Sequence, residues 1–302
     1  MNKRAAVNGI VLLNKPTGRT SNHALQEVKR IFRARKAGHT GSLDPLASGL
    51  LPVCLGEATK VSTFLLDADK RYSLTARFGE RTTTGDAEGE IIARRGIDDL
   101  NAQRVREVLE KFRGRLRQIP PMYSAVKRQG QPLYKLARRG IEVEREARDI
   151  EVFEFEVTAY QDAEYCFELH CSKGTYVRTL VDDIGERLGC GAHVRALCRT
   201  GIGVFQAPEQ TGVTLQQLHS AAESGADALA QYLLPLDAAL VNWPDVTLTS
   251  DMVFYVRQGQ AVQVPRAPTS GFLRLYARDG SFVGMGRVQE DGKIAPKRLL
   301  AR

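Results

Sequence analysis

The sequence predicts an α+β protein: a mixed sheet with flanking helices extends to about residue 245, and a small β-rich domain follows. The main indication is the alternation in "RYSLTARF" (71–78), where every second residue is apolar and faces the same side of a strand. Two further alternating segments, 150–157 and 165–171, are separated by a short polar connection, which is typical of antiparallel neighbours. Leu180, Val181, Ile184 and Leu188 have helical spacing and place a helix after these strands. A length of 302 residues allows two domains.

Each remaining element follows from its local pattern of apolar, capping and turn residues. The expected elements are a strand at 9–13, a helix capped by Thr20 and Ser21 and ending in "RARKAG" (33–38), a strand at 50–55, a helix at 57–66, a polar loop at 79–90, a helix at about 101–112, a strand at 192–200, and, in 251–302, short strands and turns with a hairpin at Asp279-Gly280. Gly189 is expected to stop the helix that precedes the strand at 192–200.

The positive charge of the chain is concentrated in one segment. The net charge is +8, and residues 111–141 carry nine Lys and Arg without any Asp or Glu, which leaves 34 basic and 35 acidic residues elsewhere. Such a run can be an ordinary solvated face. Tyr123 and Tyr134 lie among the cations, however, and offer flat rings for bases beside charges for phosphates. The segment therefore favours a nucleic-acid partner.

Composition also argues against several other classes of protein. No apolar run approaches the ~18 residues of a membrane-spanning helix, and the basic start of the chain is better explained by a first strand than by a signal peptide. The five cysteines are odd in number and form no C-x-x-C pair, which argues against a disulfide framework and a metal site. We therefore expect the reducing cytoplasm as the compartment.

Asp44 is the single acidic residue between Gly38 and Gly56, in a stretch of glycines, prolines and small hydroxyl residues. Because Asp-Pro commonly begins a turn through the Asp side chain, a purely structural role is one interpretation. The other is that the rigid frame aims a carboxylate at a substrate, since Pro45 restricts the backbone of Asp44 and the glycines permit close approach. The residues alone leave both interpretations open.

The stretch "GHTGSLDPLASGLLPVCLGEATK" (38–60) closely resembles the catalytic signature of the bacterial tRNA pseudouridine synthase B family, whose members make pseudouridine 55 in the TΨC loop. The likeness continues in order through "GIVLLNKPTGRTSN", "LLDADKRY", "PPMYSAVKRQGQPLYKLARRGIEVERE" and "CSKGTYVRTLVDDIGERLGCGAHV". It implies a mainly antiparallel sheet of pseudouridine synthase type in 1–245, with a basic RNA-clamping insert at about 111–148, and a PUA-like RNA-binding domain in 246–302. It also implies that the partner is the T arm of tRNA. It implies no cofactor, no metal, no membrane contact and no obligate protein partner.

The resemblance assigns roles that the residues alone do not. It implies that Asp44 is the catalytic carboxylate, that Arg178 pairs with it and that Tyr72 stacks on the target base. Without it, Arg178 is a surface arginine near a helix start and Tyr72 is a packed strand residue. Tyr176 and Leu197 are implied to line the uracil pocket, His39 is implied to enter the opened RNA loop, and Lys15, Pro16 and Lys60 to give support. The residues expected to clamp RNA are Tyr123, Lys127, Arg128, Tyr134, Lys135, Arg138 and Arg139.

Two alternatives remain at this stage. A guide-RNA-directed pseudouridine synthase shares the Asp loop, although the segment 111–141 and the compact tail favour a stand-alone enzyme. A non-catalytic factor that folds the T arm is the second alternative, and the intact set of Asp44, Tyr72 and Arg178 argues against it.

Overall fold

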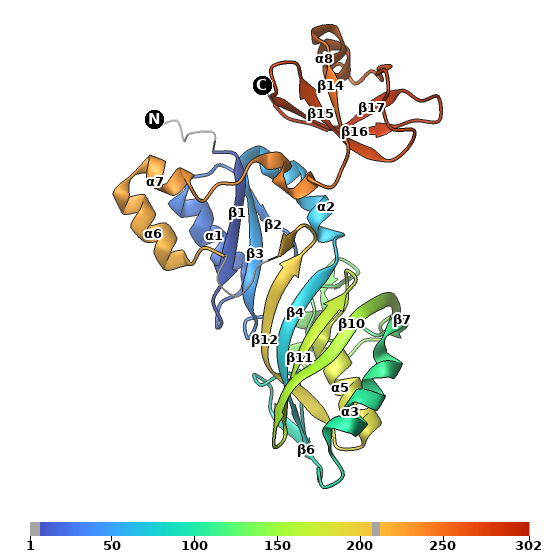
Figure 1. Ribbon diagram of the computed structural model, residues 1–302. Helices are drawn as coiled ribbons and strands as arrows, with labels where there is room; N and C mark the ends of the chain where they lie inside the picture. Colours follow the sequence, from blue (N-terminus) through green and yellow to red (C-terminus); the bar gives the residue numbers. More distant parts are fainter. Residues whose placement is uncertain (1–6, 207–211, 302) are drawn as a thin grey trace.

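A computed structural model describes residues 7–206 and 212–301, which form a long body carrying a small sheet at one end (Figure 1). The strands of the large sheet are β1 (Gly9–Lys15), β2 (Ala37–His39), β3 (Ser48–Leu55), β4 (Lys70–Phe78), β7 (Gly114–Gln118), β10 (Arg148–Gln161), β11 (Glu164–Cys171), β12 (Ala192–Ile202) and β13 (Phe205–Gln206). Their spatial order is β1-β3-β12-β4-β11-β10-β7, with β2 beside β3 and β13 beside β12. All pairs are antiparallel except a short parallel contact of β3 with β12, so the predicted mainly antiparallel sheet is confirmed.

The alternation in β4 determines which of its side chains are buried. Tyr72, Leu74, Ala76 and Phe78 are all buried, and the intervening residues are partly exposed. These four residues join the main hydrophobic core with apolar side chains of the neighbouring strands and helices. The strand lies near the middle of the sheet, between β12 and β11, so its buried face is central in the body.

Helices cover the sheet and cap its ends (Figure 1). They are α1 (Ser21–Ile31), α2 (Ser62–Leu66), α3 (Ala102–Leu109), α5 (Val177–Leu188), α6 (Leu215–Ser224) and α7 (Ala226–Ala230), with the 3-10 turns η1 (Gly56–Lys60), η2 (Glu110–Phe112) and η3 (Leu236–Leu240). Thr20 caps α1 by accepting the backbone N–H of His23, and Gly189 ends α5 in the left-handed region at φ 85°, as expected.

Three element predictions are wrong in part. The first helix ends at Ile31 and not within 33–38, because residues 37–39 pair with β3 as a strand and Arg33 turns the chain at φ 52°. The expected helix at 57–66 is divided into η1 and α2. The expected loop at 79–90 contains β5 (Glu80–Thr82), which pairs with β6 (Ile91–Arg94).

The small sheet is formed by β14 (Asp245–Leu248), β15 (Phe272–Ala277), β16 (Phe282–Val288) and β17 (Ile294–Leu299). The hairpin between β15 and β16 turns at Gly280 with φ 81°, as the sequence predicts. The expectation of strands and turns alone in 251–302 is wrong, because α8 (Ser250–Arg257) opens this region. Thr249 accepts the backbone N–H of Met252 and so supplies an N-cap that the sequence interpretation overlooked.

The small sheet packs on the body through apolar contacts. Met285 of β16 is fully buried in a cluster with Ile10 and Leu50 of the large sheet. Beside this cluster, the ring centroids of Phe64 and Trp243 are 4.7 Å apart. Lys60 adds a polar link by donating from Nζ to the carbonyl of Leu299 at 2.7 Å.

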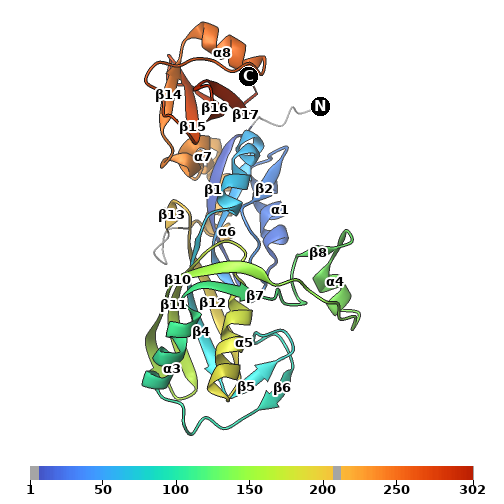
Figure 2. The ribbon, with the colours of Figure 1, turned by 90° about the vertical axis from the view of Figure 1, so that its right-hand side faces the viewer.

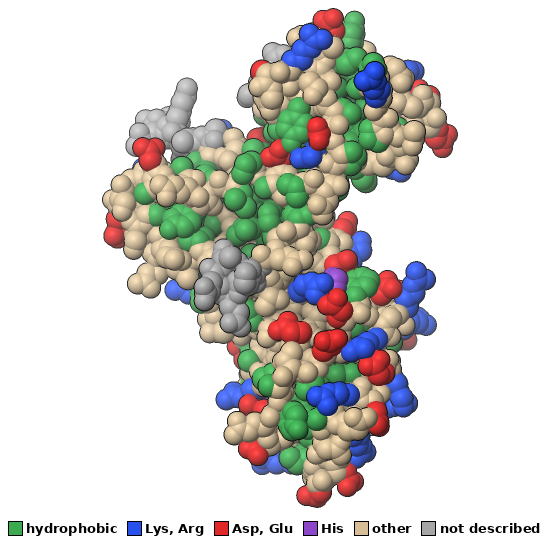
Figure 3. Space-filling model, viewed as in Figure 1, with side chains coloured by type: hydrophobic (Ala, Val, Ile, Leu, Met, Phe, Trp, Pro, Cys, Tyr) green, Lys and Arg blue, Asp and Glu red, His purple; other side chains and the backbone are tan. Residues whose placement is uncertain are grey.

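Residues 119–147 of the basic insert form an arm outside the main sheet, whereas residues 114–118 form β7 of that sheet. In Figure 2 the strands β8 (Lys127–Arg128) and β9 (Gln131–Pro132) and the helix α4 (Leu133–Ala137) project sideways from the edge formed by β7 and β10. On the face seen in Figure 3, charged side chains crowd the lower half of the body, whereas hydrophobic and uncharged side chains cover much of the part over α6 and α7.

Candidate active site

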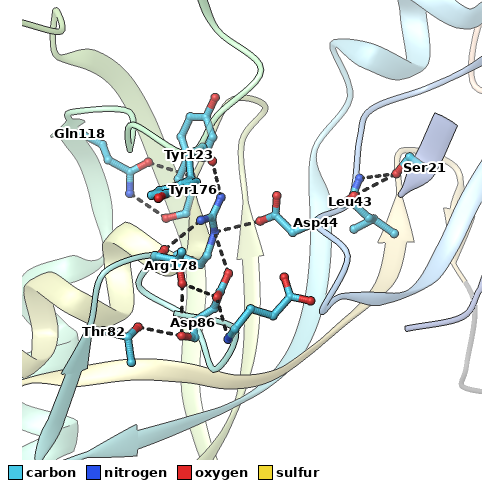
Figure 4. Close-up of polar contacts among 11 residues, drawn as sticks. Ser21, Leu43, Asp44, Thr82, Asp86, Gln118, Tyr123, Tyr176 and Arg178 are labelled. Carbon is cyan, nitrogen blue, oxygen red and sulfur yellow. Dashed lines mark hydrogen bonds and ion pairs between the residues drawn. The ribbon is translucent and has the colours of Figure 1, made fainter. Parts of the chain in front are cut away.

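Asp44 lies in the loop 40–47 between β2 and β3, and several hydrogen bonds fix this loop. The backbone N–H of Leu43 donates to Ser21 Oγ at 2.7 Å, and the same hydroxyl contacts the Leu43 carbonyl at 3.0 Å (Figure 4). The backbone N–H of Gly18 donates to the Pro45 carbonyl at 2.8 Å. The residues on both sides of Asp44 are therefore held by the segment that leads into α1, and the carboxylate has little freedom to move.

Arg178 is the main partner of Asp44. Its Nε lies 2.8 Å from Oδ2 of Asp44, while Nη1 donates to the Thr84 carbonyl at 2.8 Å and Nη2 to the Tyr123 carbonyl at 2.7 Å. The residue is 5% exposed although it is the second residue of α5, where the helix dipole disfavours a cation. Specific acceptors in all three directions explain how the guanidinium can be buried there.

A second carboxylate shares this guanidinium. Asp86 Oδ2 lies 3.6 Å from Arg178 Nε, the same nitrogen that contacts Asp44, and both carboxylates lie beside this guanidinium in Figure 4. Asp86 is 3% exposed, and its Oδ1 accepts the Thr84 hydroxyl at 2.5 Å and the Glu88 backbone N–H at 3.1 Å. The sequence analysis missed Asp86, because nothing in the loop 79–90 distinguishes it from the neighbouring acidic residues.

The surroundings move the pKa of Asp44 in opposite directions. Burial raises the pKa of this carboxyl above its usual range, Arg178 opposes the rise and Asp86 adds to it, so the net direction is upward. The Asp44 side chain keeps 42% exposure because it faces an open pocket. The carboxylate is thus held by a guanidinium on one side and available to a ligand on the other.

The pocket has a volume of about 320 Å³ and joins most of the residues that the resemblance assigns to the uracil site. Asp44, Tyr72, Tyr176, Arg178 and Leu197 all line it. They come from the loop 40–47, from β4, from the start of α5 and from β12. Its volume lies at the lower end of the range for small-ligand sites, which suits one nucleoside unit.

Tyr176 is held by its backbone rather than by a cap on α5. Gln118 of β7 donates from Nε2 to the Tyr176 carbonyl at 3.0 Å and accepts the Tyr176 backbone N–H at 2.7 Å. Burial raises the pKa of the Tyr176 hydroxyl, and burial likewise raises that of Tyr72 to about 12. Both phenols are therefore neutral at physiological pH and present ring faces and hydroxyl groups to the pocket.

His39 does not line this pocket in the described part of the chain. It lies in β2, paired with Val53, and its Nδ1 is buried without a hydrogen-bond partner among the described residues. Burial lowers the pKa of the ring, so it is neutral at physiological pH. Its expected contact with RNA stays a prediction.

Of the expected clamp residues, Tyr123 contacts the site through its backbone carbonyl, which accepts from Arg178. The others lie in the arm, where Lys127, Arg128, Lys135, Arg138 and Arg139 are exposed. The Arg138 guanidinium lies 5.6 Å from the ring centroid of Tyr134, a geometry that a base could extend by stacking. The arm and the pocket are thus connected at residues 118–124.

Within residues 7–206 and 212–301, no group of His, Cys, Asp and Glu side chains has the arrangement of a metal site. None of the helices in the same ranges is both long and apolar enough to span a bilayer. The five cysteines are free thiols.

Comparison with solved structures defines the class of fold. A chain in the crystal structure of a Cbf5-Nop10-Gar1 complex superimposes with a TM-score of 0.75 at 26% identity, over 96% of this chain and 84% of that one. A chain in an H/ACA RNP bound to a substrate RNA containing 2'-deoxyuridine superimposes with a TM-score of 0.74 at 23% identity, over 97% of this chain and 85% of that one. The fold of the large sheet and the small C-terminal sheet is that of a pseudouridine synthase.

Sequence comparison then defines the family. The model of the TruB family pseudouridylate synthase N-terminal domain matches residues 29–177, and two TruB C-terminal models match residues 178–241 and 244–300. The tRNA pseudouridine synthase B of Nitrosococcus oceani is 53% identical over 97% of this chain and 95% of the relative, and that of Tolumonas auensis is 51% identical over 97% and 92%. This chain belongs to the TruB family of pseudouridylate synthases, which are isomerases.

Proposed function

We propose that the protein isomerises uridine 55 in the TΨC loop of tRNA to pseudouridine, with Asp44 as the catalytic carboxylate. The family and the names of the relatives support the reaction and the tRNA substrate. The observation that carries the role of Asp44 is its 2.8 Å contact with Arg178 at the wall of a nucleoside-sized pocket that Tyr72 also lines.

The reaction requires that one bond breaks and another forms on the same ribose. The N1–C1′ bond of uridine is cleaved, the base turns, and C5 bonds to C1′ while the hydrogen on C5 leaves and N1 gains one. No external reagent enters the balance. Asp44 can act by attack at C1′, by addition to the base or by removal of a C2′ proton, and each route needs an ionised and fixed oxygen. Arg178 favours the ionised form of Asp44 and fixes the direction of its carboxylate.

A uridine within a folded loop has to leave its stack before it reaches this pocket. Everting one base costs a few kcal/mol, which contacts with the protein offset. The neutral rings of Tyr72 and Tyr176 beside the Asp44 carboxylate provide surfaces for the everted base. We assign the clamping of the T arm to the basic insert 111–148, with its exposed cations and the stacked Arg138–Tyr134 pair, and further RNA contacts to the C-terminal domain.

Activity on bare tRNA, without a protein partner, would distinguish the proposed enzyme from a guide-RNA-directed pseudouridine synthase. The Cbf5 neighbour is described in complex with Nop10 and Gar1, whereas the relatives at above 50% identity have the name of a tRNA enzyme. We therefore expect the isolated protein to act on bare tRNA without a protein partner, in the cytoplasm where that substrate is found.

The test uses an unmodified tRNA transcript with tritium at uracil C5, because bond formation at C5 expels the label into water. The wild type and Asp67→Asn, a control at an exposed carboxylate, should release label from one uridine, and Asp44→Asn should release none. A transcript with cytidine at position 55 should retain its label with every variant. Release by Asp44→Asn at the wild-type rate would refute the role of Asp44, and release from the cytidine-55 transcript would refute the position.

A further inference from the structure

Arg199 of β12 lies where the Asp44 loop and Tyr72 meet. In the sheet it is directly opposite Tyr72 of β4 and, on its other side, opposite Gly49 of β3. Its side chain is 1% exposed and contributes to the wall of the pocket. The sequence analysis assigned it no role.

The guanidinium contacts the backbone at two places in the site. Nε donates to the Leu50 carbonyl at 2.8 Å and Nη2 donates to the Gly41 carbonyl at 3.1 Å. Gly41 precedes Asp44 by three residues and Leu50, in β3, follows it by six, so the two bonds hold the backbone on both sides of Asp44. Tyr72 lies opposite Arg199 in the strand pair, and the guanidinium opposes the rise in the pKa of its phenol.

The backbone around Arg199 is built for this close approach. Gly49 adopts φ +98°, and a Cβ added there would lie 2.4 Å from the Arg199 carbonyl oxygen. Gly41 adopts φ +121°, and a Cβ there would meet Nη1 of Arg199 at 3.6 Å. A Cβ at Gly49 would clash with the Arg199 backbone, so glycine there lets β3 lie close to β12, whereas 3.6 Å at Gly41 is an ordinary van der Waals distance.

If Arg199 served only to fill space in the core, the desolvation of its charge would be unfavourable. Burial lowers the pKa of Arg199, and Tyr72 is the group that opposes this shift. A Met or Leu of similar volume would fill the space without the desolvation penalty of a charge. A planar fork with five N–H donors, in contrast, can reach two carbonyls at once.

We propose that Arg199 is a positioning residue that sets the Asp44 loop and Tyr72 at a fixed separation on either side of the uridine. The inference rests on the proposed function, because it assigns Arg199 a part in placing the two groups that act on the base. It does not make Arg199 a contact of the reacting atoms.

The first test compares Arg199→Met and Arg199→Lys with Arg274→Met, a matched control. Arg274 also donates from Nε to a backbone carbonyl, that of Trp243, at 3.0 Å, but it lies in the small sheet. We expect kcat on saturating tRNA to fall about 100-fold in Arg199→Met, because small misplacements of catalytic groups have effects of this size. Arg199→Lys should recover part of the loss, the affinity for tRNA should stay within about twofold, and Arg274→Met should keep the wild-type kcat.

The second test needs no catalysis. Amide hydrogen exchange in residues 40–50 should be faster in Arg199→Met than in the wild type, with exchange in β15–β17 unchanged. Unchanged exchange in the loop, or a kcat within about threefold of wild type, would overturn the proposal. If Arg199→Met does not fold, the same two readouts in Arg199→Lys decide it. A wild type that releases no label would refute the proposed function instead, while loop exchange would still show whether Arg199 holds the loop.

Discussion

Arg178 places Nε 2.8 Å from Oδ2 of Asp44 and 3.6 Å from Oδ2 of Asp86, so two carboxylates share one nitrogen of a buried guanidinium. One of these carboxylates faces the pocket and the other is enclosed, with side-chain exposures of 42% and 4%. The pair of carboxylates keeps the arginine oriented, and the arginine keeps the accessible carboxylate ionised. This arrangement determines how the site should respond to substitution and to pH.

Arg178→Lys should lower kcat by about 100-fold or more, as the loss of a preorganised charged donor does in other enzymes. A lysine has one ammonium and cannot reach Asp44 and the carbonyls of Thr84 and Tyr123 in the three directions that the guanidinium serves. Single-turnover release of tritium from saturated enzyme measures the effect. Arg187→Lys, in the last turn of the same helix, is the control and should match the wild type.

Asp86→Asn should move the acid limb of kcat/KM to lower pH. Activity requires ionised Asp44 and is lost as the pH falls through its pKa, which Asp86 helps to raise. Removing the Asp86 charge lowers that pKa, so the ionised form persists to a lower pH. The measurement is a pH profile of label release at limiting substrate, with Glu90→Gln in the same segment as control. An acid limb that stays in place or moves upward would contradict the assignment.

Ser21→Ala should reduce the free energy of unfolding by about 1–3 kcal/mol, because the Leu43 N–H and carbonyl would lose a buried partner. The N-cap of α1 is Thr20, so the substitution does not remove the cap. Urea unfolding followed by circular dichroism measures the change. Ser224→Ala, which removes an exposed hydroxyl bonded within α6, should change stability by about 0.5 kcal/mol at most.

Arg138→Ala combined with Arg139→Ala should weaken tRNA binding and flatten its salt dependence. Each lost phosphate contact lowers the slope of log K against log salt by about one unit. kcat at saturating tRNA should not change, because these side chains are exposed in the arm and do not line the pocket. Binding titrations at several salt concentrations measure the slope, and Arg106→Ala with Arg187→Ala is the matched double control. An unchanged slope would show that these two arginines do not contact the phosphates of the RNA.

Features encoded by neighbouring residues were predictable from the sequence. The buried face of β4, which carries Tyr72, was predicted from strict alternation. The start of α1 was predicted from Thr20, and the end of α5 from Gly189. The termination of α1 at Ile31 was missed because the pairing of residues 37–39 with β3 outweighed the local helical pattern, and the helix α8 was missed because its N-cap at Thr249 was overlooked. The resemblance implied that Asp44 pairs with Arg178, and the structure gives the geometry of that contact.

The sequence by itself determined many of the strands and helices, the concentration of positive charge in one segment and the isolation of Asp44 among glycines and prolines, since these depend on residues close together in the chain. Only the tertiary structure decided that Asp86 shares Arg178 and that Arg199, opposite Tyr72 in the sheet, bonds to the backbone on both sides of Asp44. The partner of a buried charge depends on which remote segments the folded sheet brings within hydrogen-bonding distance. Local backbone preference does not determine this.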